Sequence, residues 1–405
     1  MTGSARAGTT ASPAATSTST AAARRAGGLA ALDELLGRPV SMRGLALLRV
    51  LVGPVVLLHL WPFLADALDG RIYRDAFHEP YAGWYPELPR TLYVGLLWAG
   101  AAAAVAMTIG LVTRLATAVT LAIVAYNLFL STTHVHNNRA YLVIVLATLA
   151  VAPCGRELSV DAWLRRRRGL PPLPRSAPGW PLWLLRFEAA VVYAASGLSK
   201  LVDPDWFGGT VTWHRVVRVR DQVADSPLPG WAIDVLTDRS FHTYAAKVIV
   251  LTEVFIALGL WWRGTRDAAV WVAVCFHVVI HLTARVEVFS YLAIAALVIW
   301  AVPSTRDRVL VVDPLRPGPR RLAAAVRRLD WLARFRIEHG PPGAPLEVLD
   351  RDGRTVAGGQ AVALALSRLP LTAWPALPAT VRTAIRRPAP PRDTTVRAAA
   401  AREAT

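Results

Sequence analysis

The chain has 405 residues, of which 54% are hydrophobic and only 18% charged, yet its formal net charge is +17. A soluble domain carries about 25% charged residues and a disordered chain is low in hydrophobicity, so both classes are excluded for most of the sequence. Nucleic-acid binding would explain the charge but not the apolar content. A multi-pass membrane protein explains both, because cytoplasmic loops collect Arg and Lys. We therefore expect a lipid bilayer, and no nucleic acid, as partner.

Cysteine and lysine are both rare. Two cysteines, Cys154 and Cys275, exclude a disulfide framework and a Cys-based zinc site. All but two of the 45 basic residues are arginine, the exceptions being Lys200 and Lys247. Residues 1–40 contain no acidic residue before Asp33 and no apolar core typical of a signal peptide, so they are expected to form a disordered tail.

Eight apolar segments follow, close to the roughly 20 residues that a membrane-spanning helix needs. They are 50–65, 91–113, 115–138, 140–155, 180–201, 244–262, 268–284 and 288–305. Charged residues interrupt the fifth and sixth. The pattern predicts an all-α bundle of about eight transmembrane helices over residues 41–303.

The loops between these segments predict an orientation in the cell membrane. With the N-terminus in the cytoplasm, the inside loops are basic and the first outside loop is acidic, as the positive-inside rule requires. The inside residues are Arg114, Arg165–Arg168, Arg263, Arg266, Arg306 and Arg308, and the outside residues are Asp66, Asp69, Asp75, Glu79 and Glu87. Eight crossings place the C-terminus in the cytoplasm too. The long outside loop 202–243, which contains Arg215, Arg218 and Arg220, is the exception.

A small α/β unit is expected over residues 307–380, before a disordered tail at 381–405. Its pattern predicts strands at 308–312 and 345–349 and helices at 320–335 and 359–369, with a turn at 350–353 between them.

Ionisable side chains within apolar segments are costly and often mark functional sites. Arg186, Tyr193, Ser196 and Lys200 fall within about 40° of one helix face at 100° per residue. Lys200 admits two interpretations. It is a lysine reaching the outer interface, paired with Asp203 or Asp205, or a base, because lysine, unlike arginine, can lose its proton when desolvated.

Three further groups of polar residues remain open. Glu253 and Lys247 lie on different faces of one segment, and a structural ion pair with another helix is the simpler account. His277 and His281 share a face, but with no third ligand at motif distance, hydrogen-bonded core histidines are favoured over a metal site. The run His136-Asn137-Asn138-Arg139 is either a loop anchor or one wall of a pocket at the outer rim.

Four short runs of residues occur along the chain in an order that is typical of a known group of membrane proteins. They are Leu48–Gly53, His136–Leu142, Tyr193–Leu201 with Asp205-Trp206 and Gly208, and Phe276-His277 with Val288–Leu292 downstream. Together they resemble the vitamin-K-dependent γ-carboxylase-like membrane proteins, the group called horizontally transferred transmembrane (HTTM) domains. The resemblance implies a lipophilic quinone or hydroquinone as ligand, with Lys200 at the position of the base that deprotonates it.

The chain departs from the carboxylases of that group at two points. Arg139 stands where they have an assisting histidine, and the large luminal region that binds protein substrates has no counterpart. The resemblance leaves His277, His136, Asn137, Asn138, Arg139, Arg186 and Tyr193 as pocket candidates. Two functions remain open. The protein is either an enzyme that acts on a quinone-like compound or a non-catalytic protein that binds or transports a ligand or a peptide partner. Both functions are compatible with a homo-oligomer.

The C-terminal unit resembles a thioredoxin-like domain of the DCC1 type. The resemblance rests on Arg308–Pro314, the Leu329-Asp330-Trp331 step, the Leu349–Gly353 turn and Trp374. That family has an Asp-Gly-x-Cys-x-x-Cys start, but the equivalent stretch here, Asp313–Arg320, has no cysteine. The resemblance therefore implies a degenerate domain without thiol chemistry.

Overall fold

A computed structural model of the chain describes residues 30–74, 78–218, 220–224, 229–284, 286, 288–303, 308–350, 353–369 and 371–372. Most of both predicted tails, and Asp75, Arg306 and Trp374, lie outside these ranges. Residues 30–37 are helical and Pro39–Ser41 forms strand β1, paired antiparallel with β2 (Ser176–Pro178). The end of the expected N-terminal tail is thus structured.

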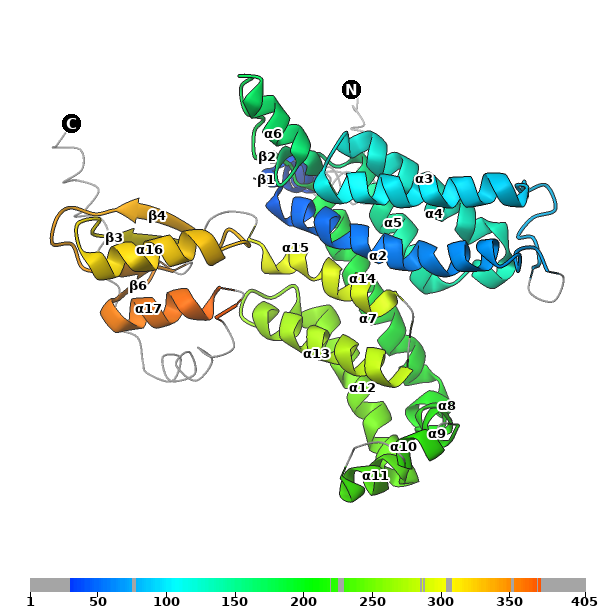
Figure 1. Cartoon of the computed structure of the whole chain (residues 1–405). Helices are drawn as coiled ribbons and strands as arrows, with labels where there is room; N and C mark the ends of the chain where they lie inside the picture. Colours follow the sequence, from blue (N-terminus) through cyan, green and yellow to red (C-terminus); the bar gives the residue numbers. More distant parts are fainter. Residues whose placement is uncertain are drawn as a thin grey trace, which may run out of the picture.

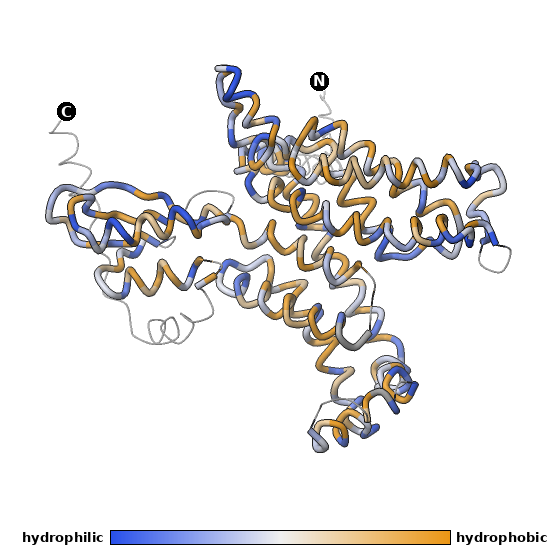
Figure 2. The backbone as a smooth tube through the Cα atoms, in the orientation of Figure 1, coloured by the Kyte–Doolittle hydropathy of each residue, from blue (hydrophilic) through white to orange (hydrophobic). Residues whose placement is uncertain are grey.

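Each of the eight apolar segments contains a helix. These are α2 (Arg43–Leu68), α3 (Arg90–Ile109), α4 (Thr113–Leu130), α5 (Asn137–Val151), α7 (Trp180–Val202), α12 (Arg239–Gly259), α13 (Arg266–Ala284), and the pair α14 (Phe289–Ala296) and α15 (Val298–Ala301). In Figure 2 these helices are predominantly hydrophobic along their length. Within the described ranges, four of them (α2, α3, α4 and α12) are long and apolar enough to cross a bilayer.

Three of the other four segments fall short of the same standard of length or composition. α5 has 15 residues, and α14 with α15 spans only Phe289–Ala301. α7 has 23 residues but carries Arg186, Glu188 and Lys200. A membrane-associated helical bundle is therefore established, and the expected eight crossings are not.

Close packing of α2 on α3 organises one part of the bundle. A Cβ added to Gly53 of α2 would lie 1.7 Å from Thr108 Oγ1 and 3.2 Å from the Ala104 carbonyl oxygen of α3. The α2 side chains Leu45, Leu48 and Val52 are fully buried in the core that results. A second part pairs α7 with α12, which run side by side in Figure 1.

The long segment between α7 and α12 is folded into helices. It contains α8 (Pro204–Phe207), α9 (Thr210–Val217), α10 (Arg220–Ala224) and α11 (Gly230–Thr237), which gather at one end of the bundle in Figure 1. Near the opposite end, α6 (Val160–Arg167) contains three of the four consecutive arginines and Arg168 follows it. Two single-turn 3₁₀ helices, η1 (Thr132–His134) and η2 (Cys154–Arg156), flank α5.

The C-terminal unit has the order β3 (Arg308–Val312), α16 (Pro317–Leu329), β4 (Phe335–His339), β5 (Glu347–Leu349), β6 (Thr355–Ala357) and α17 (Gly358–Ser367). Its sheet order is β4-β3-β5-β6, with β3 parallel to β4 and the other pairs antiparallel. The predicted C-terminal boundary of the helix at 320–335 is wrong. α16 stops at Leu329, where Asp330 accepts hydrogen bonds from the Arg334 and Phe335 amides, and Phe335 begins a strand.

Hydrogen bonds and ion pairs connect this unit to the ends of the bundle helices. Arg334 donates to the Ala301 carbonyl at 3.0 Å and lies 3.4 Å from Asp267 at the start of α13. Arg368 also pairs with Asp267, and Arg43 at the start of α2 donates to the Trp331 carbonyl at 3.0 Å. In Figure 1 the unit projects from the bundle beside α13 and α15.

Candidate functional site

Lys200 lies near the C-terminal end of α7 in an ion pair with Glu253 of α12. Its Nζ atom is 2.8 Å from both Glu253 carboxylate oxygens and also donates to the Ser196 hydroxyl one turn back along α7. Ser196 in turn donates to Glu253 Oε1 at 2.9 Å. The structure therefore does not support Asp203 as the partner of Lys200: Asp203 instead accepts from the Asp205 and Trp206 amides at the start of α8.

Lys200 is shielded from solvent in this position. Its side chain is 14% exposed and that of Glu253 only 5%. The Trp206 ring centroid lies 5.1 Å from Nζ, and Arg215 lies 5.5 Å from the same centroid. The backbone of α7 comes close to α12 here, since a Cβ on Gly197 would meet Glu253 Cβ at 3.3 Å. Lys200 is thus held in the α7–α12 interface by a carboxylate.

A second polar contact on α7 joins two of the predicted pocket residues. The Tyr193 hydroxyl is 2.7 Å from His277 Nε2 of α13, and both side chains are buried. His277 Nδ1 has no hydrogen-bond partner within the part of the chain that the structure describes. Phe276 and Phe289 surround the imidazole ring with edge-on contacts of 5.6 and 5.5 Å between ring centroids.

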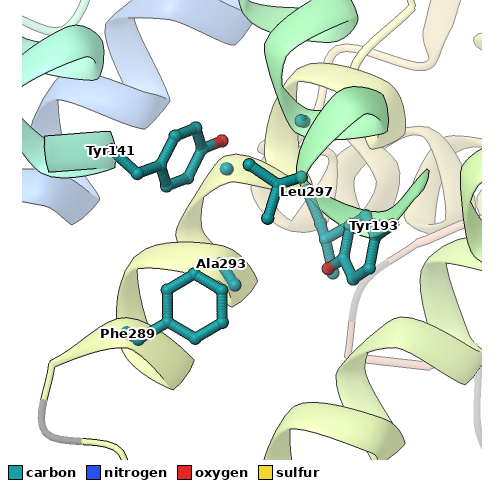
Figure 3. Close-up of a pocket in the computed structure, with 8 residues that line it drawn as sticks. Tyr141, Tyr193, Phe289, Ala293 and Leu297 are labelled. Atoms are coloured by element: carbon teal, nitrogen blue, oxygen red, sulfur yellow. The ribbon is translucent and has the colours of Figure 1, made fainter. Parts of the chain in front are cut away.

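Tyr193 also lines a small apolar cavity between α5, α7 and α14, with Leu297 after α14 as a further lining residue. Its empty volume is about 250 Å³, including the part that opens outward. Figure 3 shows Tyr141, Tyr193 and Phe289 around this space together with Ala293 and Leu297. The enclosed part of this space holds about one water molecule, so a ring-shaped ligand needs some separation of these helices to enter.

Arg186 lies on α7 with Tyr193 and Lys200, but its hydrogen bonds are with α15. Its guanidinium donates to the Ile299 carbonyl of α15 from Nε at 3.3 Å and Nη2 at 2.8 Å. The Trp183 and Trp300 rings lie 5.3 and 5.0 Å from it. Arg186 therefore hydrogen-bonds a backbone carbonyl group of α15. It is not one of the residues that line the cavity.

The run His136-Asn137-Asn138-Arg139 begins α5. His136 accepts from the Asn138 amide at 3.2 Å as the N-cap, and Asn137 opens the helix on an exposed position. Arg139 lies 5.3 Å from the Phe63 ring centroid of α2 and donates to the His134 carbonyl at 3.2 Å. These contacts favour the loop-anchor interpretation, and no described contact joins the run to Lys200.

The two histidines of α13 do not form a metal pair. His281 Nε2 is 3.0 Å from the Tyr291 hydroxyl, whereas His277 contacts Tyr193. Among the described residues, no group of three His, Cys, Asp or Glu side chains could hold a metal ion.

The sequence predicts Lys200, Tyr193 and His277 as site residues, and the structure shows the contact of each. The pairing of Lys200 with Glu253 was not predicted. The available signal was that Glu253 is the sole acidic residue in the apolar segment 244–262. Tyr141 and Phe289 of the cavity lie in two of the four runs that carry the family resemblance, but the sequence did not predict them as pocket residues.

Comparison with known proteins identifies one family. The HTTM domain matches residues 37–304, which covers the helical bundle and most of the chain. No curated protein and no solved structure matches the chain. The match agrees with the four sequence runs and with the apolar helices of the bundle. The chain therefore belongs to the HTTM domain family.

Proposed function

We propose that this protein is a multi-pass cell-membrane protein that binds a quinone-like lipophilic compound and uses Lys200 as a base toward it. The single observation that carries the proposal is the buried Lys200–Glu253 pair, with Nζ 2.8 Å from both carboxylate oxygens. Tyr193, two turns earlier on the same helix, lines a small apolar cavity, which the ring of such a ligand enters only when the surrounding helices separate.

The pair gives lysine a way to become basic. An ammonium group cannot accept a proton, but transfer of its proton to the adjacent carboxylate produces a neutral amine and a carboxylic acid. The amine then takes the proton of a hydroquinone hydroxyl, so that the pair gains one proton and the ligand becomes its anion.

The proposal also includes the arrangement of the helices in the membrane and the class of the C-terminal unit. We place all eight helical segments across the bilayer, with both termini in the cytoplasm. The C-terminal unit is a cysteine-free thioredoxin-like domain of the DCC1 type, supported by its β-α-β start, its antiparallel hairpin and its final helix. In this proposal the unit packs against the bundle or binds a partner, and it performs no thiol chemistry.

The experiment has two arms. Lipids co-purified with the protein are identified by mass spectrometry, with a lipid-soluble quinone as the expected result. Oxygen uptake on addition of a hydroquinone is then compared among Lys200→Ala, Lys200→Arg and Lys247→Arg. We expect both Lys200 variants to lose activity, because arginine stays protonated. Lys247→Arg serves as the matched control. Full activity of Lys200→Arg contradicts a role as base.

A non-catalytic function is the second candidate, and the same ion pair favours it. Both carboxylate oxygens of Glu253 accept hydrogen bonds from Lys200, and the pair connects α7 to α12. In that case the protein retains a bound lipid or a peptide partner, and no Lys200 variant changes oxygen uptake.

A further inference from the structure

A strongly basic surface lies at the end of the bundle where α2 begins. It consists of the four consecutive arginines Arg165–Arg168, at the end of α6, and of Arg114 in the first turn of α4. All of these arginines except Arg165 are exposed, and none of them forms an ion pair with a described residue. We call this group the basic surface.

The acidic residues beside the basic surface are already bound to other groups. Glu157 pairs with Arg43 at 3.4 Å. The Asp161 carboxylate accepts hydrogen bonds of 2.7–2.8 Å from the Val112 amide and from the Thr113 amide and hydroxyl. The positive charge at the end of α6 is therefore available to an anion from outside the protein.

Short contacts fix the direction of α6 against the turn between α3 and α4. The Asp161 amide donates to the Gly110 carbonyl at 3.0 Å, and Ser159 caps α6 by accepting from the Ala162 amide at 3.0 Å. Gly110 has φ +72°, and a Cβ there would lie 2.4 Å from Ser159 Cβ, so this approach requires glycine. In Figure 1 α6 runs across the direction of α3 and projects beyond the side of the bundle, and its far end is hydrophilic in Figure 2.

Apolar side chains are exposed next to the arginines. Trp163, Leu170 and Leu173 are each between 43% and 46% exposed. The Arg167 guanidinium lies 5.0 Å from the Trp163 ring centroid. Tryptophan and leucine beside several arginines are typical of a helix that lies in the membrane interface. A nucleic acid or a dissolved anion would explain the arginines but not the apolar residues.

The position of α6 also matches the level of the lipid headgroups. α3 ends at Ile109 and α4 begins at Thr113, and both helices are long and apolar enough to cross a bilayer. The ends of such helices lie at the membrane surface. Because α6 starts against this turn and runs across α3, it lies along that surface. In the orientation proposed above this is the cytoplasmic surface, which carries anionic lipids.

We propose that α6 is an interfacial helix whose basic surface binds the phosphate groups of anionic phospholipids. Trp163, Leu170 and Leu173 enter the boundary between headgroups and acyl chains, and the arginines pair with phosphate oxygens, which match the guanidinium geometry. The inference rests on the proposed placement of α3 and α4 across the bilayer, and it does not depend on the quinone or on Lys200.

The first test measures the lipid selectivity of the full-length protein. The protein is placed in nanodiscs with equal amounts of phosphatidylglycerol and phosphatidylcholine, and the lipids that it retains are counted by native mass spectrometry. The variant is Arg166→Gln/Arg167→Gln/Arg168→Gln. The matched control makes the same change at three exposed arginines of α16, Arg320, Arg321 and Arg327. We expect the α6 variant to lower the preference for phosphatidylglycerol by about tenfold or more, because each arginine near an anionic surface adds to the attraction, and the control to keep it.

The second test locates the end of α6 relative to the bilayer without removing a charge. A nitroxide label on Leu170→Cys is compared with one on Leu315→Cys, because Leu315 is a leucine of the C-terminal unit that is 72% exposed. Both variants also carry Cys275→Ser, since Cys275 is exposed, whereas Cys154 is buried. We expect the label at residue 170 to be more accessible to oxygen than to a water-soluble nickel chelate, as in lipid, and the label at residue 315 to show the reverse.

Each outcome decides the proposal. A loss of selectivity in the α6 variant alone, with a label at residue 170 that is in lipid, supports it. The proposal is overturned if both triple variants lose the preference equally, if neither loses it, or if the label at residue 170 is in water. The last result would assign the basic surface to a soluble acidic partner. Neither measurement involves the quinone, so failure here is distinct from failure of the quinone site.

Discussion

Lys200 of α7 and Glu253 of α12 form an ion pair in which Nζ is 2.8 Å from each carboxylate oxygen, and the two side chains are only 14% and 5% exposed. One of the chain's two lysines is thus held between two helices by the sole acidic residue of α12. Gly197 makes this contact possible, because its missing side chain lets α12 approach α7.

The first prediction concerns the energy of that pair. Glu253→Gln keeps the size of the side chain and removes its charge, leaving the Lys200 ammonium buried without a counter-charge. Breaking a buried pair in this way costs about 3–5 kcal/mol. Thermal unfolding in detergent should show a clearly lower Tm for Glu253→Gln.

The double variant Lys200→Met/Glu253→Gln removes both charges and should recover part of the loss. Lys247→Met, on α12 with its Nζ 5.6 Å from the Phe207 ring centroid, is the matched control and should change Tm little. An unchanged Tm for Glu253→Gln alone would mean that the pair adds no stability.

The second prediction concerns the Tyr193–His277 hydrogen bond. Tyr193→Phe removes the hydroxyl that lies 2.7 Å from Nε2, which leaves both nitrogens of a buried imidazole without a partner among the described residues. An unsatisfied buried polar group costs about 1–3 kcal/mol. Tyr244→Phe is the matched control, since Tyr244 is 69% exposed. Equal Tm values for the two variants would contradict the prediction.

The third prediction compares two glycines in neighbouring helices. Gly53→Ala in α2 places a methyl group against Thr108 and the Ala104 carbonyl, and overpacking of this kind costs about 1–3 kcal/mol. Gly95→Ala in α3 meets nothing within 4 Å and should stabilise the helix by up to about 1 kcal/mol. Opposite shifts in Tm are expected, and shifts of the same sign would argue against close α2–α3 packing.

The fourth prediction is a pH dependence at Asp161 in α6. Burial alone would raise the pKa of this carboxyl, but hydrogen bonds from the Thr113 amide and hydroxyl and the Val112 amide outweigh it, and the pKa is lowered. A lowered pKa in the folded state adds stability that is present above the ordinary value of about 4 and is lost as the pH falls through the folded value.

Asp161→Asn should therefore lower Tm at pH 7, and the difference from the unaltered chain should shrink as the pH falls below about 4. Asp234→Asn in α11 is the control and should give no comparable difference, because no donor among the residues that the structure describes bonds the Asp234 carboxylate. A difference that stays constant down to pH 3 would show that the carboxylate charge is not what stabilises this contact.

Local patterns were sufficient to locate the helices of the bundle. Apolar windows marked all eight helical segments because a helix that packs in lipid or in a bundle must be apolar over most of its length. The strand at Arg308–Val312 was equally clear from its run of β-branched residues. The strand β4 was missed because the helix expected over residues 320–335 ran into its first residue, Phe335, and β6 was missed because it has only three residues.

The sequence by itself determined the family, the helical segments and the choice of Lys200, because composition, periodicity and an unusual lysine are properties of single positions and short windows. Only the tertiary structure decided which side chains meet. It paired Lys200 with Glu253, assigned Arg186 to a helix end and brought η1 to the end of α2. These contacts join residues 53, 113 and about 70 positions apart, and their geometry depends on how helices pack, which no local pattern specifies.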